Sequence, residues 1–309
     1  MLIASDGPPP PAYGAAMHRL KHLLPVLAAI GGVAFLSLMD AYMKSAALAA
    51  GTYNATLLRS VFASAIVVPV WLLAGGKWPK RDVLKIHILR GSVSALMALS
   101  FFFALTKMPI AEAIAISFIA PLIALYLAAV LLGEVIRRQA VLGSILGFVG
   151  TLVIVGGQIS LTTFDRDLTL GLAALAFSAL LYSWNFIIIR QQSQLAKPLE
   201  IASFHSGVAG VVLLLASPWL FSVPGTESLG DITMAALLTI GGAMMLAWAY
   251  ARAQAQELVP MEYSGFLWAA LFGWLFFGEE VTPVTLLGTV LIVIGCLIAT
   301  RKRTEQTAV

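Results

Sequence analysis

The amino-acid sequence predicts an all-α, polytopic integral membrane protein with ten transmembrane helices arranged as two inverted five-helix repeats. Three observations predict this fold class: the composition, the spacing of long apolar runs and an internal self-similarity. Of the 309 residues, 60% are hydrophobic even without the 26 glycines, and only 11% are charged. A soluble domain is about 45–50% apolar and about 25% charged. No interior of this size hides so much apolar surface from water, so we expect the chain to lie in a bilayer.

Ten apolar runs follow one another along the chain, each near the length of about 20 residues that a bilayer-crossing helix needs. The joints between the runs hold helix-ending residues, such as Gly75-Gly76 and Thr282-Pro283. The first run is interpreted as an uncleaved anchor rather than a signal peptide, because nine more follow it. The predicted spans are residues 22–42, 52–75, 85–106, 109–132, 138–156, 168–190, 199–217, 231–252, 255–277 and 283–300.

The positions of lysine and arginine predict the orientation. Of the 19 such residues, fourteen fall in one set of alternate loops and tails, and only Lys44, Lys107 and Arg166 fall in the other set. Arg59 and Arg90 lie inside spans. Positively charged loops stay on the cytoplasmic side. We therefore expect a cytoplasmic (inner) membrane protein with both termini in the cytoplasm. Residues 1–21, which include the proline run Pro8 to Pro11, are expected to form a disordered tail, and residues 301–309 a basic tail.

The two halves of the sequence match at a fixed offset. A shift of 145 residues places Gly133-Glu134 on Gly278-Glu279, and a shift of 146 places Arg59 on His205. The predicted repeats are residues 22–156 and 168–300. Each repeat holds five spans, an odd number, so the second repeat must be inverted relative to the first. Inverted repeats are common in secondary transporters, which bind substrate near the midplane between the halves.

These features resemble an EamA-type member of the drug/metabolite transporter superfamily, whose members have ten helices in two five-helix EamA repeats. The resemblance covers about residues 22–300. It is carried by Ala104-Leu105, Pro109, Ala120-Pro121-Leu122, Leu132-Gly133-Glu134, Gly143 and Gly150, and by Ala249-Tyr250, Pro260-Met261-Glu262-Tyr263, Trp268-Ala269, Phe277-Gly278-Glu279, Gly288 and Gly295. The segment Asp40-Ala-Tyr-Met-Lys44, with Arg59, is similar to the branch of S-adenosylmethionine and riboflavin carriers. Phe266 stands where the first copy has Pro121, so the two halves need not bend alike.

The residue inventory excludes several classes of function. The single cysteine, Cys296, excludes a disulfide framework, and the four histidines lack metal-ligand spacing. The chain has no phosphate-binding glycine loop and no continuous basic stripe for nucleic acid. We expect no cofactor, no metal, no nucleic-acid partner and no enzymatic activity. The alternative from another class is a membrane-embedded enzyme acting on a lipid or a lipid-linked substrate, but no span holds a nucleophile–base pair. An ion channel is a third possibility, disfavoured because no ring of filter loops is present.

The leading hypothesis is a secondary transporter that moves a small organic metabolite across the cytoplasmic membrane by alternating access. The expected partners are the lipid bilayer and a substrate such as S-adenosylmethionine, riboflavin or an amino acid, with the protein acting as a monomer or homodimer. Without a nucleotide site, the energy must come from an ion or substrate gradient. Glu262 is the candidate for proton coupling, because a buried carboxyl group can take up a proton.

Ionisable side chains inside membrane spans are costly and usually face a cavity or a partner. Five residues meet this description: Asp40, Arg59, Arg90, His205 and Glu262. For three of them a simpler interpretation stays open. Asp40 can pair with Lys44 one helical turn later, Arg90 can extend to lipid phosphates, and His205 can be a hydrogen-bonded core residue.

A second group of candidates is polar or aromatic. Glu112 follows Pro109 at a helix N-terminus, so it can stabilise the helix dipole or contact substrate. Tryptophan and tyrosine often form interfacial belts, but three of them lie inside spans beside polar residues and could stack a planar or cationic solute. The candidate substrate and coupling cavity thus comprises Asp40, Arg59, Arg90, Glu112, Trp184, Asn185, His205, Glu262, Tyr263 and Trp268.

Overall fold

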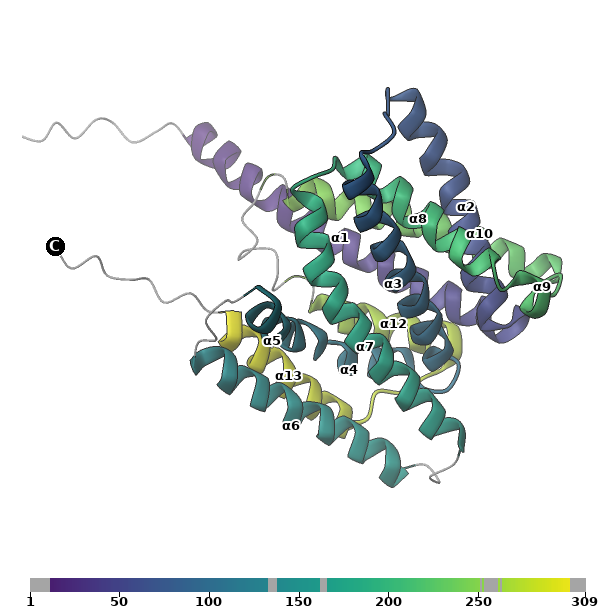
Figure 1. Ribbon diagram of the computed structural model, residues 1–309. Helices are drawn as coiled ribbons and strands as arrows, with labels where there is room; N and C mark the ends of the chain where they lie inside the picture. The colour runs from purple at the N-terminus through teal and green to yellow at the C-terminus, as the bar shows by residue number, and fades with distance from the viewer. Residues whose placement is uncertain are drawn as a thin grey trace, which may run out of the picture.

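The protein is a bundle of helices (Figure 1). The computed structural model describes residues 12–132, 138–161, 166–250, 252, 261 and 263–300, and none of these lies in a strand. The helices are α1 (Ala12–Ala50), α2 (Thr52–Leu73), α3 (Arg81–Leu105), α4 (Ile110–Ser117), α5 (Ala120–Leu132), α6 (Arg138–Leu161), α7 (Arg166–Ser193), α8 (Pro198–Leu214), α9 (Ser217–Leu220), α10 (Thr226–Tyr250), α12 (Ser264–Phe277) and α13 (Pro283–Thr300).

The helices confirm the all-α polytopic fold. Within the described chain, α1, α2, α3, α7 and α10 are long and apolar enough to cross a membrane, judged by length and composition. Shorter apolar helices cover residues 110–124, 141–157, 198–214, 264–277 and 283–295. Each of these ten segments falls on one of the ten predicted spans. The one-turn helix α9 lies in the connection between α8 and α10.

The first helix is longer than predicted at both ends. The helix α1 begins at Ala12, so the prediction of a disordered tail is wrong for residues 12–21, and residues 1–11 lie outside the described residues. Alanine, methionine, leucine, arginine and lysine dominate this stretch and favour helix, which need not stop where the apolar run stops. The first turns of α1 project from the bundle (Figure 1). At the other end, Gly51 has a φ of 85°, a left-handed conformation that suits glycine and separates α1 from α2.

The fourth predicted span is broken into α4 and α5. The break falls at Phe118 and Ile119, just before Pro121, which cannot donate a backbone hydrogen bond and so favours a break in the helix. In the second repeat, α12 begins at Ser264, within one residue of the position aligned with the start of α5, although Phe266 stands where Pro121 does. The first repeat therefore contains a discontinuous helix, the kind of segment that forms binding sites in many transporters.

Contacts between the two halves are reproduced when the repeats are exchanged. The repeat pairs α1 with α7 and α3 with α10, so the contact between α1 and α10 becomes the contact between α7 and α3, and both are present. The repeat also pairs α2 with α8 and α6 with α13, and the two helices of each of these pairs contact each other. Individual bonds follow the same rule. The Ser37 hydroxyl on α1 donates to the Gly265 carbonyl on α12 at 3.4 Å, and the Ser183 hydroxyl on α7 donates to the Ala120 carbonyl on α5 at 3.0 Å. This exchange is expected for two repeats related by a pseudo-two-fold axis.

Glycines bring α6 and α13 close together, and they too obey the exchange. A Cβ atom added to Gly150 would lie 2.6 Å from the Gly288 carbonyl oxygen, and one added to Gly295 would lie 2.5 Å from the Gly143 carbonyl oxygen. Gly150 aligns with Gly295 and Gly143 aligns with Gly288, so exchanging the repeats converts one contact into the other. The two helices lie side by side at one edge of the bundle (Figure 1). Small residues permit such close approach between membrane helices.

Polar contacts gather at the two ends of the bundle. At one end, which we call the Lys44 end, Ser45 on α1 donates to Asp231 on α10 at 2.6 Å, and Lys107 pairs with Asp167 at 2.9 Å. The opposite end, called the His87 end, includes the first turns of α3 and α8. Lys107 follows the last turn of α3, whereas His87 lies near its start. The two ends are thus separated by most of the length of α3.

Candidate functional site

Arg59 is held in the interior by three helices. It lies on α2, and its Nη1 donates to Thr239 Oγ1 on α10 at 3.3 Å. Its guanidinium carbon lies 5.2 Å from the centre of the Phe102 ring on α3, a cation–π contact. Its Nε atom is buried without a hydrogen-bond partner. A guanidinium group has five N–H donors, so Arg59 retains donors for a ligand.

Asp40 on α1 and His205 on α8 lie within electrostatic range of Arg59. In the described part of the chain, no ion pair joins Asp40 to Arg59, and Nδ1 of His205 is buried without a hydrogen-bond partner. Each of the three residues is half-buried and keeps part of its surface accessible. We call Asp40, Arg59, Phe102, His205 and Thr239 the central site.

Lys44 does not neutralise Asp40, although it lies one helical turn away. Its ammonium group forms an ion pair with Glu279, which follows α12, and donates to the Met108 carbonyl at 2.8 Å. The second carboxylate oxygen of Glu279 accepts the Ile110 backbone N–H at the start of α4, at 2.8 Å. This Lys44–Glu279 cluster ties α1, α4 and the α12–α13 connection together at the Lys44 end. The interpretation of Asp40 and Lys44 as a mutual surface pair is therefore not supported.

Arg90 turns into the protein instead of extending toward lipid phosphates. Only 8% of the residue is exposed, and its Nη1 donates to the Oε1 atom of Gln192 on α7 at 2.7 Å. Arg90 also lies within electrostatic range of His205 in the central site. The structure therefore places it between the central site and the polar groups of the His87 end.

Three residues that the sequence analysis did not identify are linked to Arg90 by successive hydrogen bonds. Gln192 bonds to Nδ1 of His87 on α3, and Nε2 of His87 lies 3.1 Å from an oxygen of Glu200 on α8. The ring of His87 stacks on Phe204, with centroids 4.5 Å apart and planes 10° from parallel. These residues are isolated in the sequence, and only the packing of α3, α7 and α8 joins them. In the sequence, the only sign of this group is that all three residues are polar and lie near the predicted cytoplasmic ends of their spans.

Glu112 connects two helices. It lies in the first turn of α4, as expected for a carboxylate at a helix N-terminus, and only 1% of the residue is exposed. Its Oε1 accepts a hydrogen bond from Thr285 Oγ1 on α13 at 3.1 Å. This contact supports a role in joining α4 to α13.

The aromatic candidates do not share one pocket in the described contacts. Trp184 is 39% exposed, whereas its neighbour Asn185 is buried with an Oδ1 atom that lacks a hydrogen-bond partner. Consecutive residues of a helix point about 100° apart, which explains the contrast. Tyr263 packs edge-on against Phe118, its repeat mate, and Trp268 stacks on a phenylalanine of its own helix. Glu262 lies outside the described residues.

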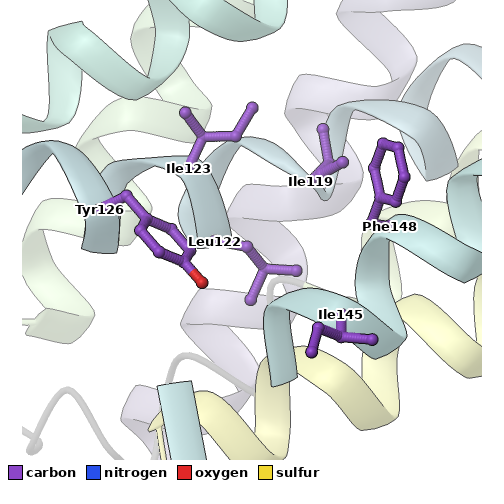
Figure 2. A pocket seen from close by; sticks show the side chains of 6 residues that line it. All are labelled: Ile119, Leu122, Ile123, Tyr126, Ile145 and Phe148. Carbon is purple, nitrogen blue, oxygen red and sulfur yellow. The ribbon is translucent and has the colours of Figure 1, made fainter. Parts of the chain in front are cut away.

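An apolar pocket that shares no lining residue with the central site lies between α5 and α6 (Figure 2). Its volume is about 310 Å³, and the only polar side-chain atom among its lining residues is the Tyr126 hydroxyl. Ile145 and Phe148, which form one wall, are each more than half exposed on the surface of the bundle. The lining residues are Ile119, Leu122, Ile123, Tyr126, Ile145 and Phe148. Such a pocket suits hydrocarbon and offers nothing to bind a charged solute.

The described helices fall on the ten predicted spans, pack as two exchangeable halves and carry charged residues between them, an arrangement typical of multi-pass membrane transporters. The model of the EamA-like transporter family matches residues 23–156 and 169–301, so the chain belongs to this family. It is 26% identical over 279 residues to the pseudopaline exporter CntI of Pseudomonas aeruginosa, covering 90% of this chain and 96% of that protein. It is 26% identical to the S-adenosylmethionine uptake transporter of Rickettsia bellii, covering 78% of this chain and 81% of that protein.

A solved structure confirms the fold. It superimposes with a TM-score of 0.62 over 89% of this chain and 97% of that chain, at 20% sequence identity. The relatives are named as transporters of small molecules and not as enzymes. The protein is accordingly a secondary transporter with a small-molecule substrate, and the alternative of a membrane-embedded enzyme is not supported.

Proposed function

We propose that the substrate is a small organic zwitterion of the amino-acid type, bound in the central site with its carboxylate toward Arg59 and its ammonium group toward Asp40. The observation that carries this proposal is the incomplete pairing of both charges. Alternating access would expose the site to each side of the membrane in turn.

Arg59 supplies the anion-binding half of the site. One N–H donates to Thr239 at 3.3 Å, which is long for a hydrogen bond, and Nε has no partner. The Phe102 ring lies beside the guanidinium group and restricts its orientation. A planar guanidinium fork matches a carboxylate through two parallel N–H donors. A substrate carboxylate would therefore satisfy donors that the protein leaves open.

Asp40 supplies the cation-binding half. Lys44, the nearest cation along its own helix, is occupied by Glu279. An ionised carboxylate inside a membrane span is costly without a partner, and an ammonium group delivered by the substrate would provide one. Amino acids and S-adenosylmethionine carry both charges on one α-carbon. Riboflavin carries neither, so we expect it to bind less well.

Orientation and energy coupling complete the proposal. The excess of lysine and arginine at the other face supports an outward-facing Lys44 end, with both termini in the cytoplasm of a cytoplasmic-membrane protein. Transport is then driven by proton coupling or by exchange. Glu262 is the proposed proton-coupling carboxyl group, because the sequence places it inside the ninth span.

Counterflow in liposomes tests the proposal. Purified protein is reconstituted into vesicles loaded with unlabelled solute, and entry of the same labelled solute is measured for methionine, S-adenosylmethionine and riboflavin. We expect exchange of at least one zwitterion and little of riboflavin. Arg59→Lys and Asp40→Asn should each reduce this exchange at least tenfold, because Lys lacks the planar fork and Asn lacks the charge.

Arg166→Lys is the matched control for Arg59→Lys, because Arg166 is exposed at the Lys44 end. This control should exchange like the wild type. Exchange of riboflavin without any zwitterion, or undiminished exchange by both central-site variants, would exclude the proposed substrate class.

A further inference from the structure

Four polar side chains form an unbroken hydrogen-bonded chain at the His87 end. The order is Arg90, Gln192, His87 and Glu200, contributed by α3, α7, α3 and α8. Arg90, Gln192 and His87 are buried, and the Glu200 side chain keeps 19% of its surface exposed. The chain therefore runs from the neighbourhood of the central site to a partly accessible carboxylate.

The donor and acceptor at every link follow from Arg90. A guanidinium group only donates, so the Gln192 atom that faces it must be the carbonyl oxygen. The amide nitrogen of Gln192 then faces His87 and donates to Nδ1. Nδ1 must be unprotonated to accept this bond, so the ring proton lies on Nε2 and is donated to Glu200. This set of bonds requires a neutral His87 in its Nε2–H tautomer.

A second proton on His87 is incompatible with this arrangement. Once Nδ1 carries a proton, it can only donate, and Gln192 must turn its amide to offer the oxygen. The amide nitrogen would then face Arg90, placing one donor against another. The Arg90–Gln192 bond would break, and the positive charge on His87 would repel the guanidinium group. Glu200 remains an acceptor for Nε2–H in both states.

Three buried polar atoms without a hydrogen-bond partner belong to Arg90 and to two residues near it. Ser94 lies on the same face of α3, one helical turn from Arg90, and its hydroxyl is buried without a hydrogen-bond partner. Nδ1 of His205, within electrostatic range of Arg90, is also unpartnered. The Nε atom of Arg90 itself lacks an acceptor. Unpaired buried polar atoms are rare and call for an explanation, and a second position of Arg90 would satisfy several at once.

We propose that His87 is a proton-binding site whose protonation turns the Gln192 amide and releases Arg90 toward the central site. Released Arg90 would add a cation beside Arg59 and His205, so proton binding would favour an anionic group there. As a coupling device this rests on the proposed transport function, but the proton site itself does not.

The groups around His87 are accounted for on each packed element. On α8, Glu200 faces Nε2, and Phe204 covers one face of the ring. On α7, the neutral Gln192 faces Nδ1. From α2, Trp71 reaches Phe204 at 5.5 Å, and it is not titratable. Asp82 and Lys85, which precede His87 in the first turns of α3, pair with each other at the surface.

Nuclear magnetic resonance of the full chain in lipid nanodiscs tests the proposal without any transported solute. With ¹⁵N-labelled histidine and arginine, the His87 signals are assigned from their loss in His87→Gln, and the Arg90 signals from Arg90→Lys. His205 is assigned in the same way, so that the titrations of the two histidines are separated. We expect the Nε2–H tautomer of His87 at alkaline pH. On acidification, the Arg90 side-chain signals should shift with the same midpoint as His87.

Two variants should uncouple Arg90 from pH. In Gln192→Glu, the carboxylate offers an oxygen to both neighbours, so Arg90 stays bound through the titration of His87. In His87→Gln, the amide reproduces the bonds of the neutral ring but takes up no proton. Arg90 signals should stay constant in both variants, and Gln191→Glu, at the exposed neighbouring position, should keep the coupled shift.

Three results would overturn the proposal. They are an Nδ1–H tautomer at alkaline pH, a His87 that stays neutral until the protein unfolds in acid, and Arg90 signals that do not follow His87. A protein that shows the coupled shift but exchanges none of the tested zwitterions would retain the proton switch and lose only the proposed substrate class.

Discussion

Replacing Lys44 by methionine would leave the Glu279 carboxylate without its cation. The two side chains are only 8% and 14% exposed, so the pair is largely shielded from water. Removing one partner of a buried pair costs about 3–5 kcal/mol, because the other charge is left uncompensated. Glu279 keeps the Ile110 N–H at 2.8 Å, and water can reach part of it. We therefore expect the lower part of that range, about 3 kcal/mol of unfolding free energy.

A double-mutant cycle isolates the pair. Lys44→Met, Glu279→Gln and the double variant are unfolded reversibly in mixed detergent micelles, and the unfolding free energies are compared. Glutamine at 279 still accepts the Ile110 N–H, so the double variant should be more stable than Lys44→Met by about 1–2 kcal/mol. The matched control is Lys107→Met at the same end. Its partner Asp167 is 63% exposed, so this change should cost less than about 1 kcal/mol.

Two results would refute this reasoning. One is a Lys44→Met variant that loses no more stability than Lys107→Met. The other is strict additivity of the two single changes, which would mean that Lys44 and Glu279 do not interact. Either result would remove the Lys44–Glu279 cluster as the contact that holds α1, α4 and the α12–α13 connection together.

Three further predictions concern packing, coupling and topology. Gly150→Ala should lower the unfolding free energy by about 1–3 kcal/mol, because the new Cβ would lie 2.6 Å from a carbonyl oxygen of α13. Gly156→Ala on the same helix is the control, because a Cβ atom there meets nothing within 4 Å. In the same unfolding assay it should be neutral or slightly stabilising. Glu262→Gln should still exchange substrate in liposomes but should fail to concentrate it when a pH gradient is imposed; undiminished pH-driven accumulation would place coupling elsewhere. In a cysteine-free background, a cysteine at Lys80 should be shielded from impermeant reagents in intact cells and one at Glu227 should react, and the reverse pattern would invert the predicted orientation.

The fold could be predicted from the sequence because its signals are local or periodic. Apolar runs located the ten spans, and matching residues such as Gly143 and Gly288 revealed the repeat. The extent of α1 could not be predicted from hydropathy, because residues 12–21 form helix through backbone bonding and helix-favouring side chains outside the apolar run. The break between α4 and α5 had one clear signal, Pro121.

The candidate site could be predicted only in part, because depth along a span does not determine the direction of a side chain. Arg59 and His205 were found from their depth and their match across the repeats, and the structure brings them within electrostatic range. Trp184 has a similar sequence environment but points to the surface. Gln192 and Glu200 acquire their significance only from partners on other helices, which no sequence spacing encodes.

The central claim is that Arg59 recognises the carboxylate of a zwitterionic substrate. It is tested most directly by comparing the affinities of the best-exchanged zwitterion and its decarboxylated amine, for wild type and for Arg59→Gln, by calorimetry in nanodiscs. A hydrogen bond to a charged group contributes about 1.5–3 kcal/mol, so the wild type should prefer the zwitterion by roughly tenfold to a hundredfold. In Arg59→Gln this preference should fall close to one. An unchanged preference in Arg59→Gln, or equal affinities in the wild type, would contradict the claim.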